Sequence, residues 1–162
     1  MRNLTGVLVG LTALVAAAGV SPQALAHDKH ADKHATYSAG EPGDPKKPSR
    51  VIHVTMLEGE GKMLYRPAKL VINRGEQIRF VVKNIGLLPH EFLLATTAEN
   101  LQHAEEMKKY PDMEHDEPNG IRVEPGKTGE LIWRFTKKGE FEYGCLIPGH
   151  REAGMTGHII VK

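Results

Sequence analysis

The chain has 162 residues, with 21 lysines and arginines against 20 aspartates and glutamates, and it contains nine histidines, six methionines and one cysteine. This length predicts a single domain with room for an ordinary hydrophobic core, so a disulfide framework is not needed, and one cysteine excludes an internal disulfide. The balance of charge argues against a nucleic-acid-binding protein, which would show an excess or a stripe of basic residues. The unusual feature is the number of histidines beside a single thiol.

The first 26 residues have the organisation of a secretory signal peptide. Arg2 is the only charged residue among them, an apolar or small stretch runs from Leu4 to Val20, and the small residues from Ala24 to Ala26 provide a cleavage site. The apolar stretch is rich in alanine and glycine, which disfavours a membrane-spanning helix, although an uncleaved N-terminal anchor is the alternative. We therefore expect export to a bacterial periplasm and a mature chain that does not span the membrane.

Residues 27–50 are polar and rich in turn-forming residues, including three prolines. This composition predicts a flexible, disordered arm without a core of its own. The arm begins with His27, His30 and His34, and after cleavage the imidazoles would lie near a free amine that can chelate Cu(II). The arm is thus a candidate secondary copper site, and a solvated arm without a site is the alternative.

The folded domain is expected over residues 51–162, where the hydrophobic pattern is mostly of period two. We expect strands at residues 51–57, 69–72, 77–83, 90–96, 129–136, 140–145 and 157–161. In the third of these, Ile78, Phe80 and Val82 share one side. Six or seven short strands separated by glycine and proline turns indicate an all-β, antiparallel sandwich.

One segment breaks the alternating pattern. Residues 97–110 are rich in helix formers and are followed by a proline, which predicts a helical insertion between strands. On this helix two residues lie four apart and share a face, and two more follow the proline, so we consider four further candidate copper ligands: His103, Met107, Met113 and His115. The alternative is that the first methionine packs on the sandwich and the histidines face water.

The most informative segment joins the last two expected strands. It spaces a thiol, an imidazole and a thioether five residues apart, at Cys145, His150 and Met155, with glycines and a proline to supply the bends. A loop between neighbouring strands can fold back so that these three side chains converge. A second imidazole has to come from a strand end beside that loop, and His90, at the start of an expected strand, fits this requirement.

The residue types indicate copper. Two imidazoles and a thiolate with a weak axial thioether suit an ion that cycles between Cu(I) and Cu(II). Zinc is the competing metal, but it prefers closed sets of cysteine and histidine, and a methionine ligand argues against it. Taken singly, each residue has an ordinary alternative as a buried thiol, a core or surface histidine, or a packed methionine. Together, in an exported all-β chain, they favour a copper site, which also accounts for an unpaired thiol in an oxidising compartment.

These residues resemble the ligand loop of the cupredoxins, the type 1 copper proteins. Cys145, His150 and Met155 match the pattern C-x4-H-x4-M after a strand ending in Tyr-x-Cys, and His90 matches the upstream ligand. The resemblance covers residues 51–162. It implies a Greek-key β-sandwich with one type 1 copper near one end and with the second histidine near the surface as the port for electrons.

One position departs from the family pattern. Many cupredoxins have asparagine or serine after the first histidine ligand, where it braces the two ligand loops, and here that position is Glu91. We therefore expect the hydrogen bonding around the site to differ from that of those relatives.

The histidine-rich arm and the helix make the chain most similar to the periplasmic copper-tolerance cupredoxins. The resemblance implies a redox-active copper protein, and we expect that it is not an enzyme, because one short chain has no room for a second sandwich with further copper centres. The alternatives are a dedicated one-electron carrier between respiratory or oxidase partners and a copper oxidase subunit, which would need further copper centres. A redox partner would dock near the second histidine ligand, on the apolar residues Leu87, Leu88, Pro89, Ile147 and Pro148. Protection of the copper from water is a compatible reason for these residues.

Overall fold

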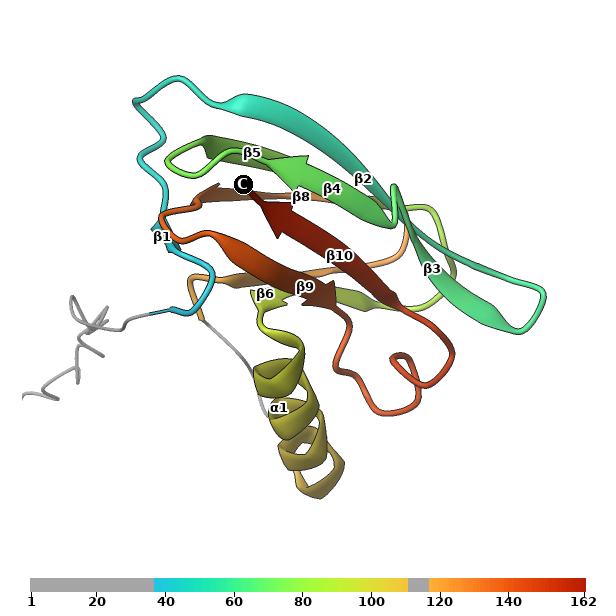
Figure 1. The fold of residues 1–162 in the computed structure, drawn as a ribbon. Coiled ribbons are helices and arrows are strands. Elements are labelled where there is room, and N and C mark those ends of the chain that lie inside the picture. The colour runs from blue at the N-terminus through green and yellow to red at the C-terminus, as the bar shows by residue number, and fades with distance from the viewer. Residues whose placement is uncertain (1–36, 111–116) are drawn as a thin grey trace, which may run out of the picture. The chain divides into compact units, whose positions relative to one another are not determined.

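Two five-stranded β-sheets face each other and one helix lies at an end of the pair (Figure 1). The structure, a computed structural model, describes residues 37–110 and 117–162. One sheet has the order β1-β8-β5-β2-β3 and the other the order β4-β10-β9-β6-β7. The elements are β1 (Glu41–Pro42), β2 (Arg50–Gly59), β3 (Lys62–Arg66), β4 (Lys69–Ile72), β5 (Gln77–Asn84), β6 (His90–Ala95), α1 (Thr97–Lys109), β7 (Gly120–Val123), β8 (Thr128–Arg134), β9 (Gly139–Gly144) and β10 (Thr156–Val161). The predicted β-sandwich with one helical insertion is confirmed.

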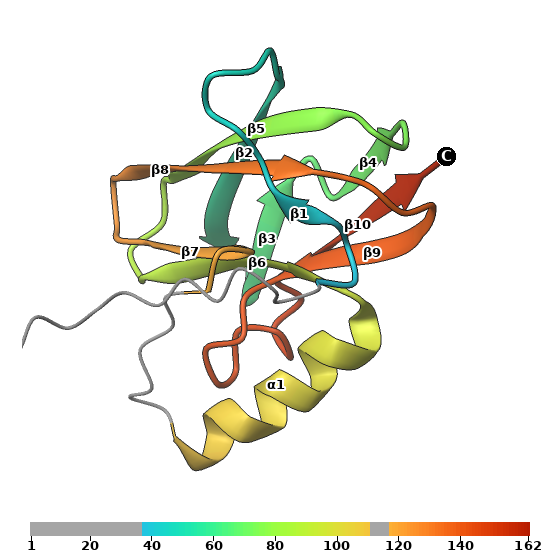
Figure 2. The same cartoon turned by 90° about the vertical axis from the view of Figure 1, so that its left-hand side faces the viewer.

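The sandwich closes because alternate side chains of its strands point inward. Ile78, Phe80 and Val82 of β5 are fully buried, as the period-two pattern predicts. On β8, which pairs with β5, Leu131 and Trp133 are buried at the partner positions. Figure 2 shows the two layers, with β2, β5 and β8 in one and β6, β7 and β9 in the other. No helix among the described residues is long and apolar enough to cross a membrane.

Residues 37–50 differ from the expected flexible arm, because they pack on the sandwich. Ala39 is fully buried, and the ring of Tyr37 meets Trp133 edge-on with the ring centroids 5.3 Å apart. The short strand β1 pairs with the outer edge of β8. An edge strand accepts a proline such as Pro42, and it covers backbone groups that β8 would otherwise leave open. The histidines of the arm, His27, His30 and His34, lie outside the described residues.

The pairing of the strands also departs from the antiparallel prediction. β2 runs parallel to β5, and β4 runs parallel to β10, while the other neighbours are antiparallel. The strands β3 and β7 were not predicted, because β3 has no clear alternation of apolar and polar residues and β7 contains only two apolar residues. Their partners β2 and β6 supply the hydrogen bonds that make them strands.

The helix α1 begins in a capping box directly after β6. The Oγ1 atom of Thr96 accepts a hydrogen bond from the backbone of Glu99 at 3.2 Å, and the Glu99 carboxylate accepts one from the backbone of Thr96 at 2.8 Å. The inner face of α1 packs in a small apolar cluster of its own, made of Leu93, Ala95, Ala104, Met107 and Leu146. Since Leu146 belongs to the loop between β9 and β10, the helix contacts both β6 and that loop.

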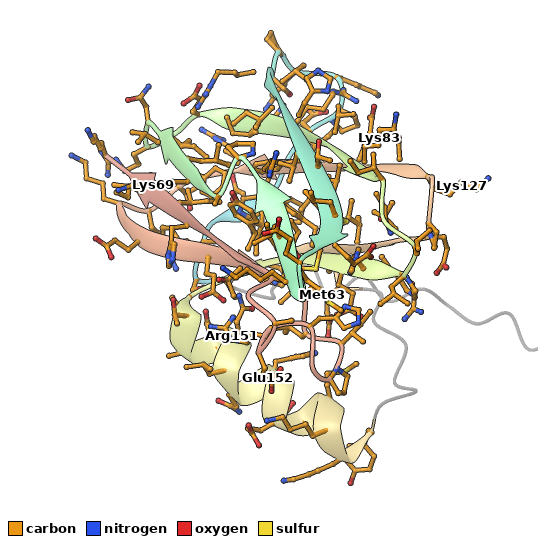
Figure 3. All side chains as sticks on the ribbon, turned by 90° about the vertical axis from the view of Figure 1, so that its right-hand side faces the viewer. Met63, Lys69, Lys83, Lys127, Arg151 and Glu152 are labelled. Atoms are coloured by element: carbon orange, nitrogen blue, oxygen red, sulfur yellow. The ribbon has the colours of Figure 1, made fainter. Side chains whose placement is uncertain are left out.

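A buried ion pair joins the loop between β9 and β10 to the sheet and the helix. Glu142 of β9 is 1% exposed, and its carboxylate accepts hydrogen bonds from both Nη1 and Nη2 of Arg151, the latter at 3.0 Å. It also accepts one from Nδ2 of Asn100 on α1 at 3.0 Å. A second contact links α1 to the loop, because Nζ of Lys108 lies 3.3 Å from Oε1 of Glu152. Figure 3 shows Arg151 and Glu152 on the loop beside the helix.

Replacing Arg151 by methionine should destabilise the protein strongly, because the Glu142 carboxylate would stay buried without its cationic partner. We expect the free energy of unfolding of the metal-free protein to fall by about 3 kcal/mol, measured by chemical denaturation. The control is Arg122→Met, because Arg122 and its partner Glu124 are both exposed and such pairs contribute little. Equal losses in the two variants would contradict this role of the pair.

Acid should weaken the start of α1. Burial raises the pKa of the Glu99 carboxyl, but the hydrogen bonds from Ser38 and Thr96 together lower it by more than burial raises it. The pKa of Glu99 therefore lies below the usual 4.5. A lowered pKa contributes stability above the unfolded-state value, and this contribution is lost as the pH falls through the folded-state value. The stability advantage of the wild type over Glu99→Gln should therefore shrink between about pH 6 and about pH 3, in unfolding measurements at each pH. If the stability advantage of the wild type over Glu99→Gln grew as the pH fell, the stabilising role of the ionised Glu99 carboxylate would be refuted.

Candidate metal centre

Three strand ends meet at one end of the second sheet. β6 begins at His90, β9 ends one residue before Cys145, and β10 begins one residue after Met155. Because β9 lies between β6 and β10 and runs antiparallel to both, the end of β9 is beside the beginnings of its two neighbours. The sheet therefore brings both ends of the loop between β9 and β10 close to the start of β6.

Three of the four predicted ligands converge at this place. The ligand atoms of His90, Cys145 and His150 all lie within 4.8 Å of one another. The Nδ1 atoms of the two imidazoles are 3.1 Å apart, and the Cys145 Sγ atom is 3.3 Å from Nδ1 of His150. His90 and Cys145 are fully buried, whereas 8% of His150 is exposed. Two nitrogen donors and one sulfur donor thus face a common point, as a metal ion requires.

Met155 lies in the same buried region. Its backbone N–H donates to the carbonyl of His150 at 3.1 Å, and its carbonyl accepts from the N–H of Cys145 at 3.2 Å. Its side chain is fully buried in the cluster that also contains Cys145. Gly149 and Gly154 take positive φ angles of 89° and 102°, a conformation that favours glycine and lets the loop fold back on itself.

Burial sets the protonation states of the donors in the metal-free protein. It raises the pKa of the Cys145 thiol to about 12, so that this group is a neutral thiol at neutral pH. Burial and the neighbouring His90 lower the pKa of His150, which keeps the second imidazole neutral. A neutral imidazole offers its lone pair to a metal ion, and binding through the sulfur as thiolate releases the thiol proton.

Glu91 connects the two segments that carry the donors. Its backbone N–H donates to the Cys145 Sγ atom at 3.4 Å, and its carboxylate accepts a hydrogen bond from the N–H of Leu146 at 3.2 Å. The side chain is only 7% exposed. The expected departure at this position is therefore a change of chemical group, from an amide or hydroxyl to a carboxylate, and the carboxylate still braces the two loops.

Glu58 contacts the donor cluster and was not predicted from the sequence. One of its carboxylate oxygens, Oε1, lies 2.6 Å from Nε2 of His90. The same carboxylate accepts hydrogen bonds from the backbone N–H groups of Leu87 at 2.8 Å and of Leu88 at 3.2 Å. Burial raises the pKa of the Glu58 carboxyl, but these hydrogen bonds together lower it by more than burial raises it. The pKa of Glu58 therefore lies below the usual value.

A pattern in the sequence could have pointed to Glu58. The residue is in phase with Ile52, Val54 and Met56, the buried positions of β2, so a carboxylate stands where the period-two pattern calls for an apolar side chain. Asn84 shows the same signal at the end of β5, because it follows Val82 in phase and is fully buried. A charged or polar residue at an inward position needs a partner, which is a reason to look for a site there.

Asn84 fixes the shape of the loop that leads to His90. Its Nδ2 atom donates to the carbonyls of Leu88 at 2.7 Å and Val123 at 2.9 Å, and its Oδ1 atom accepts from the N–H of Gly86 at 2.9 Å. This side chain therefore makes hydrogen bonds within the loop before β6 and also links that loop to the neighbouring strand β7.

The two secondary ligand candidates among the described residues, His103 and Met107, do not belong to this cluster. Met107 is 2% exposed within the small apolar cluster under α1, a placement that favours the packing alternative. His103 is half-buried and lines a cavity of about 230 Å³ together with Glu117 and Asn119. Met113 and His115 lie outside the described residues. Within residues 37–110 and 117–162, the group formed by His90, Cys145 and His150 is the one cluster of three such donors.

Comparison with known proteins agrees with this geometry. Residues 52–162 match a family model described as copper binding proteins of the plastocyanin/azurin family. The copper-resistant cuproprotein CopI of Rubrivivax gelatinosus is 43% identical, with 99% of this chain and 98% of that protein aligned. The CopI of Pseudomonas aeruginosa is 35% identical over 76% of this chain and 82% of its own length.

A solved structure supports the fold independently. The structure of auracyanin B superposes with a TM-score of 0.60, over 76% of this chain and 96% of the other, at 19% sequence identity. At this identity the likeness concerns the fold alone. The match of the family model over most of the chain, together with the converging thiol and imidazoles, leads to one conclusion: the chain belongs to the plastocyanin/azurin family of copper-binding proteins.

Proposed function

We propose that this chain is an exported, redox-active copper protein that contributes to copper tolerance in the periplasm. Its ligands would be His90, Cys145 and His150, with Met155 as a further, weaker ligand. The observation that carries the proposal is the buried convergence of one thiol and two imidazoles on one point. The role in tolerance is supported by the similarity, over almost the whole chain, to a protein named for copper resistance. The signal-like first 26 residues support the location.

The donor set fits copper in both oxidation states. Bound copper supplies a one-electron couple between Cu(I) and Cu(II). The chain contributes donors that are held before the ion arrives, since the backbone bonds of Met155 and the brace made by Glu91 fix the positions of Cys145 and His150. Donors that do not move on electron transfer keep the reorganisation small. The burial of His90 and Cys145 also excludes water from the site.

Purification with Cu(II) tests this assignment directly. We expect an intense thiolate-to-copper absorption in the visible range, together with at least one copper per chain by metal analysis. Cys145→Ser preserves the size of the side chain but supplies a hydroxyl that stays protonated, so the absorption should disappear while the metal-free variant remains folded by circular dichroism. A variant that retained the absorption would remove Cys145 from the site.

The copper-to-protein ratio separates tolerance from simple electron carriage. A ratio of one with reversible reduction favours a dedicated carrier, whereas a higher ratio that falls when residues 27–35 are deleted favours the arm as a further copper site. In cells, loss of the gene should reduce growth on high copper if the protein contributes to tolerance. Unchanged growth would contradict the tolerance role but not the copper site.

We further propose that the chain is not an enzyme by itself.

A second candidate function, electron exchange with a protein partner, rests on an exposed apolar loop beside the site. Leu87 is 88% exposed and Leu88 is 42% exposed, only a few residues before His90. Exposed apolar side chains near a redox centre suit brief docking of a partner. His150, of which 8% is exposed, would then be the port through which the electron leaves the site.

Placing a charge on this loop should slow electron exchange without changing the copper site. For Leu87→Asp we expect an unchanged absorption spectrum, because the side chain points to solvent, and a slower reduction by a redox protein that docks on the apolar loop. The matched variant is Leu101→Asp on α1, where the leucine is 51% exposed. If both variants slowed the reaction equally, net charge rather than docking at the loop would be responsible.

A further inference from the structure

We propose that Glu58 is a positioning residue of the copper site, whose carboxylate holds the Nε2–H group of His90 and thereby turns the Nδ1 atom of the ring toward Cys145 and His150. This inference deepens the proposed function and rests on it. It concerns the hydrogen bond that the outer nitrogen of the buried first histidine makes outside the donor cluster.

The contact fixes the tautomer of the imidazole. A carboxylate only accepts hydrogen bonds, so the Nε2 atom of His90, 2.6 Å from Oε1 of Glu58, has to carry the hydrogen. The neutral ring then keeps its lone pair on Nδ1, which is the atom 3.1 Å from His150. Without this partner, a fully buried His90 would have an unsatisfied N–H, or would take the other tautomer and lose its donor atom.

The same carboxylate also holds the loop that carries the ring. It accepts the backbone N–H groups of Leu87 and Leu88, which come just before His90, and Glu58 itself lies on β2 in the opposite sheet. One side chain thus ties the loop and the imidazole to a strand of the sandwich. Hydrogen bonds to a charged acceptor are the strong ones, so this arrangement restrains both the position and the rotation of the ring.

Gly86 makes room for this approach. A Cβ atom at Gly86 would lie 2.3 Å from both carboxylate oxygens of Glu58, well inside any allowed contact. The backbone of this glycine does not have a positive φ, so the need for glycine comes from the carboxylate and not from the turn. An alanine here would push the flexible end of Glu58 away and leave the backbone as it is.

A carboxylate bonded to a ligand histidine makes that ligand a stronger donor and favours the more highly charged ion. Glu58 should therefore strengthen the binding of Cu(II) more than that of Cu(I). Removing it weakens Cu(II) binding selectively, and the reduction potential rises. For a one-electron couple, each tenfold change in the ratio of the two affinities corresponds to about 59 mV.

The first test is Glu58→Gln. A glutamine has only one acceptor oxygen. If that oxygen accepts from His90, the NH2 group faces the N–H of Leu87, and if the amide turns over to accept from Leu87, the NH2 group faces His90 and favours the other tautomer of the ring. The set of three hydrogen bonds therefore cannot be kept, and a mixture of tautomers is expected. We expect Cu(II) affinity to fall by about 10-fold to 100-fold and the reduction potential to rise. The control is Glu60→Gln, which removes the same charge from the exposed end of the same hairpin and should leave affinity and potential near the wild-type values.

The second test separates position from charge. Gly86→Ala displaces the carboxylate but keeps the negative charge in the protein, and we expect it to lower Cu(II) affinity in the same direction as Glu58→Gln. Its control is Gly59→Ala, next to Glu58, where an added Cβ meets no atom within 4 Å. In the metal-free proteins, long-range ¹H–¹⁵N NMR should show the Nε2–H tautomer of His90 in the wild type and a mixture in both test variants.

The possible results are distinct. Loss of Cu(II) affinity and of the single tautomer in both test variants, with both controls unaffected, supports the proposal. Test variants that match their controls overturn it, and the proposed function stands if the wild type still shows the thiolate-to-copper absorption. A wild type without that absorption refutes the copper function, whatever the variants do. If Glu58→Gln melted far below its control, Gly86→Ala and the tautomer measurement would decide.

Discussion

Burying one thiol and two imidazoles at the end of a β-sandwich requires a partner for each remaining polar atom of these groups, because an unsatisfied polar group in the interior is costly. The rest of the site follows from this requirement. The thiol receives the backbone N–H of Glu91, and the outer nitrogen of His90 has the Glu58 carboxylate. The inner nitrogens and the sulfur are left to face one another. A metal ion is the group that can satisfy three such donors together.

The partners of these donors come from the whole sandwich. Glu58 lies on β2 of one sheet, Glu91 on β6 of the other, and the ion pair of Glu142 and Arg151 ties the loop between β9 and β10 to the strand it leaves. His90 and Cys145 are therefore each held by an element other than their own. Side chains supported in this way keep one geometry when the charge at the centre changes, and this property is what one-electron transfer requires.

Most of the strands and the cysteine and histidine of the loop between β9 and β10 could be predicted from the sequence, because these features depend on local spacing. Alternating apolar residues predict β5 and β8, and the spacing of Cys145, His150 and Met155 predicts their convergence. The parallel pairs and the packing of residues 37–50 could not be predicted in this way, because they depend on which distant strand lies alongside. Glu58 was missed for a related reason: its phase in β2 marks it as unusual, but only the fold brings it to His90.

The two residues that directly follow β9 pack in different apolar clusters. Cys145 belongs to the main core, while the next residue, Leu146, packs against α1 with Met107 and Ala104. The loop is thus anchored in two places, and its sequence is matched to the helix as well as to the metal. The loop could therefore not be transferred alone to a family member without this helix. In such a protein Leu146 would be exposed, and Arg151 would lack the hydrogen-bonded group that it forms here with Glu142 and Asn100. Conversely, removing the helix from this chain would demand a redesigned loop.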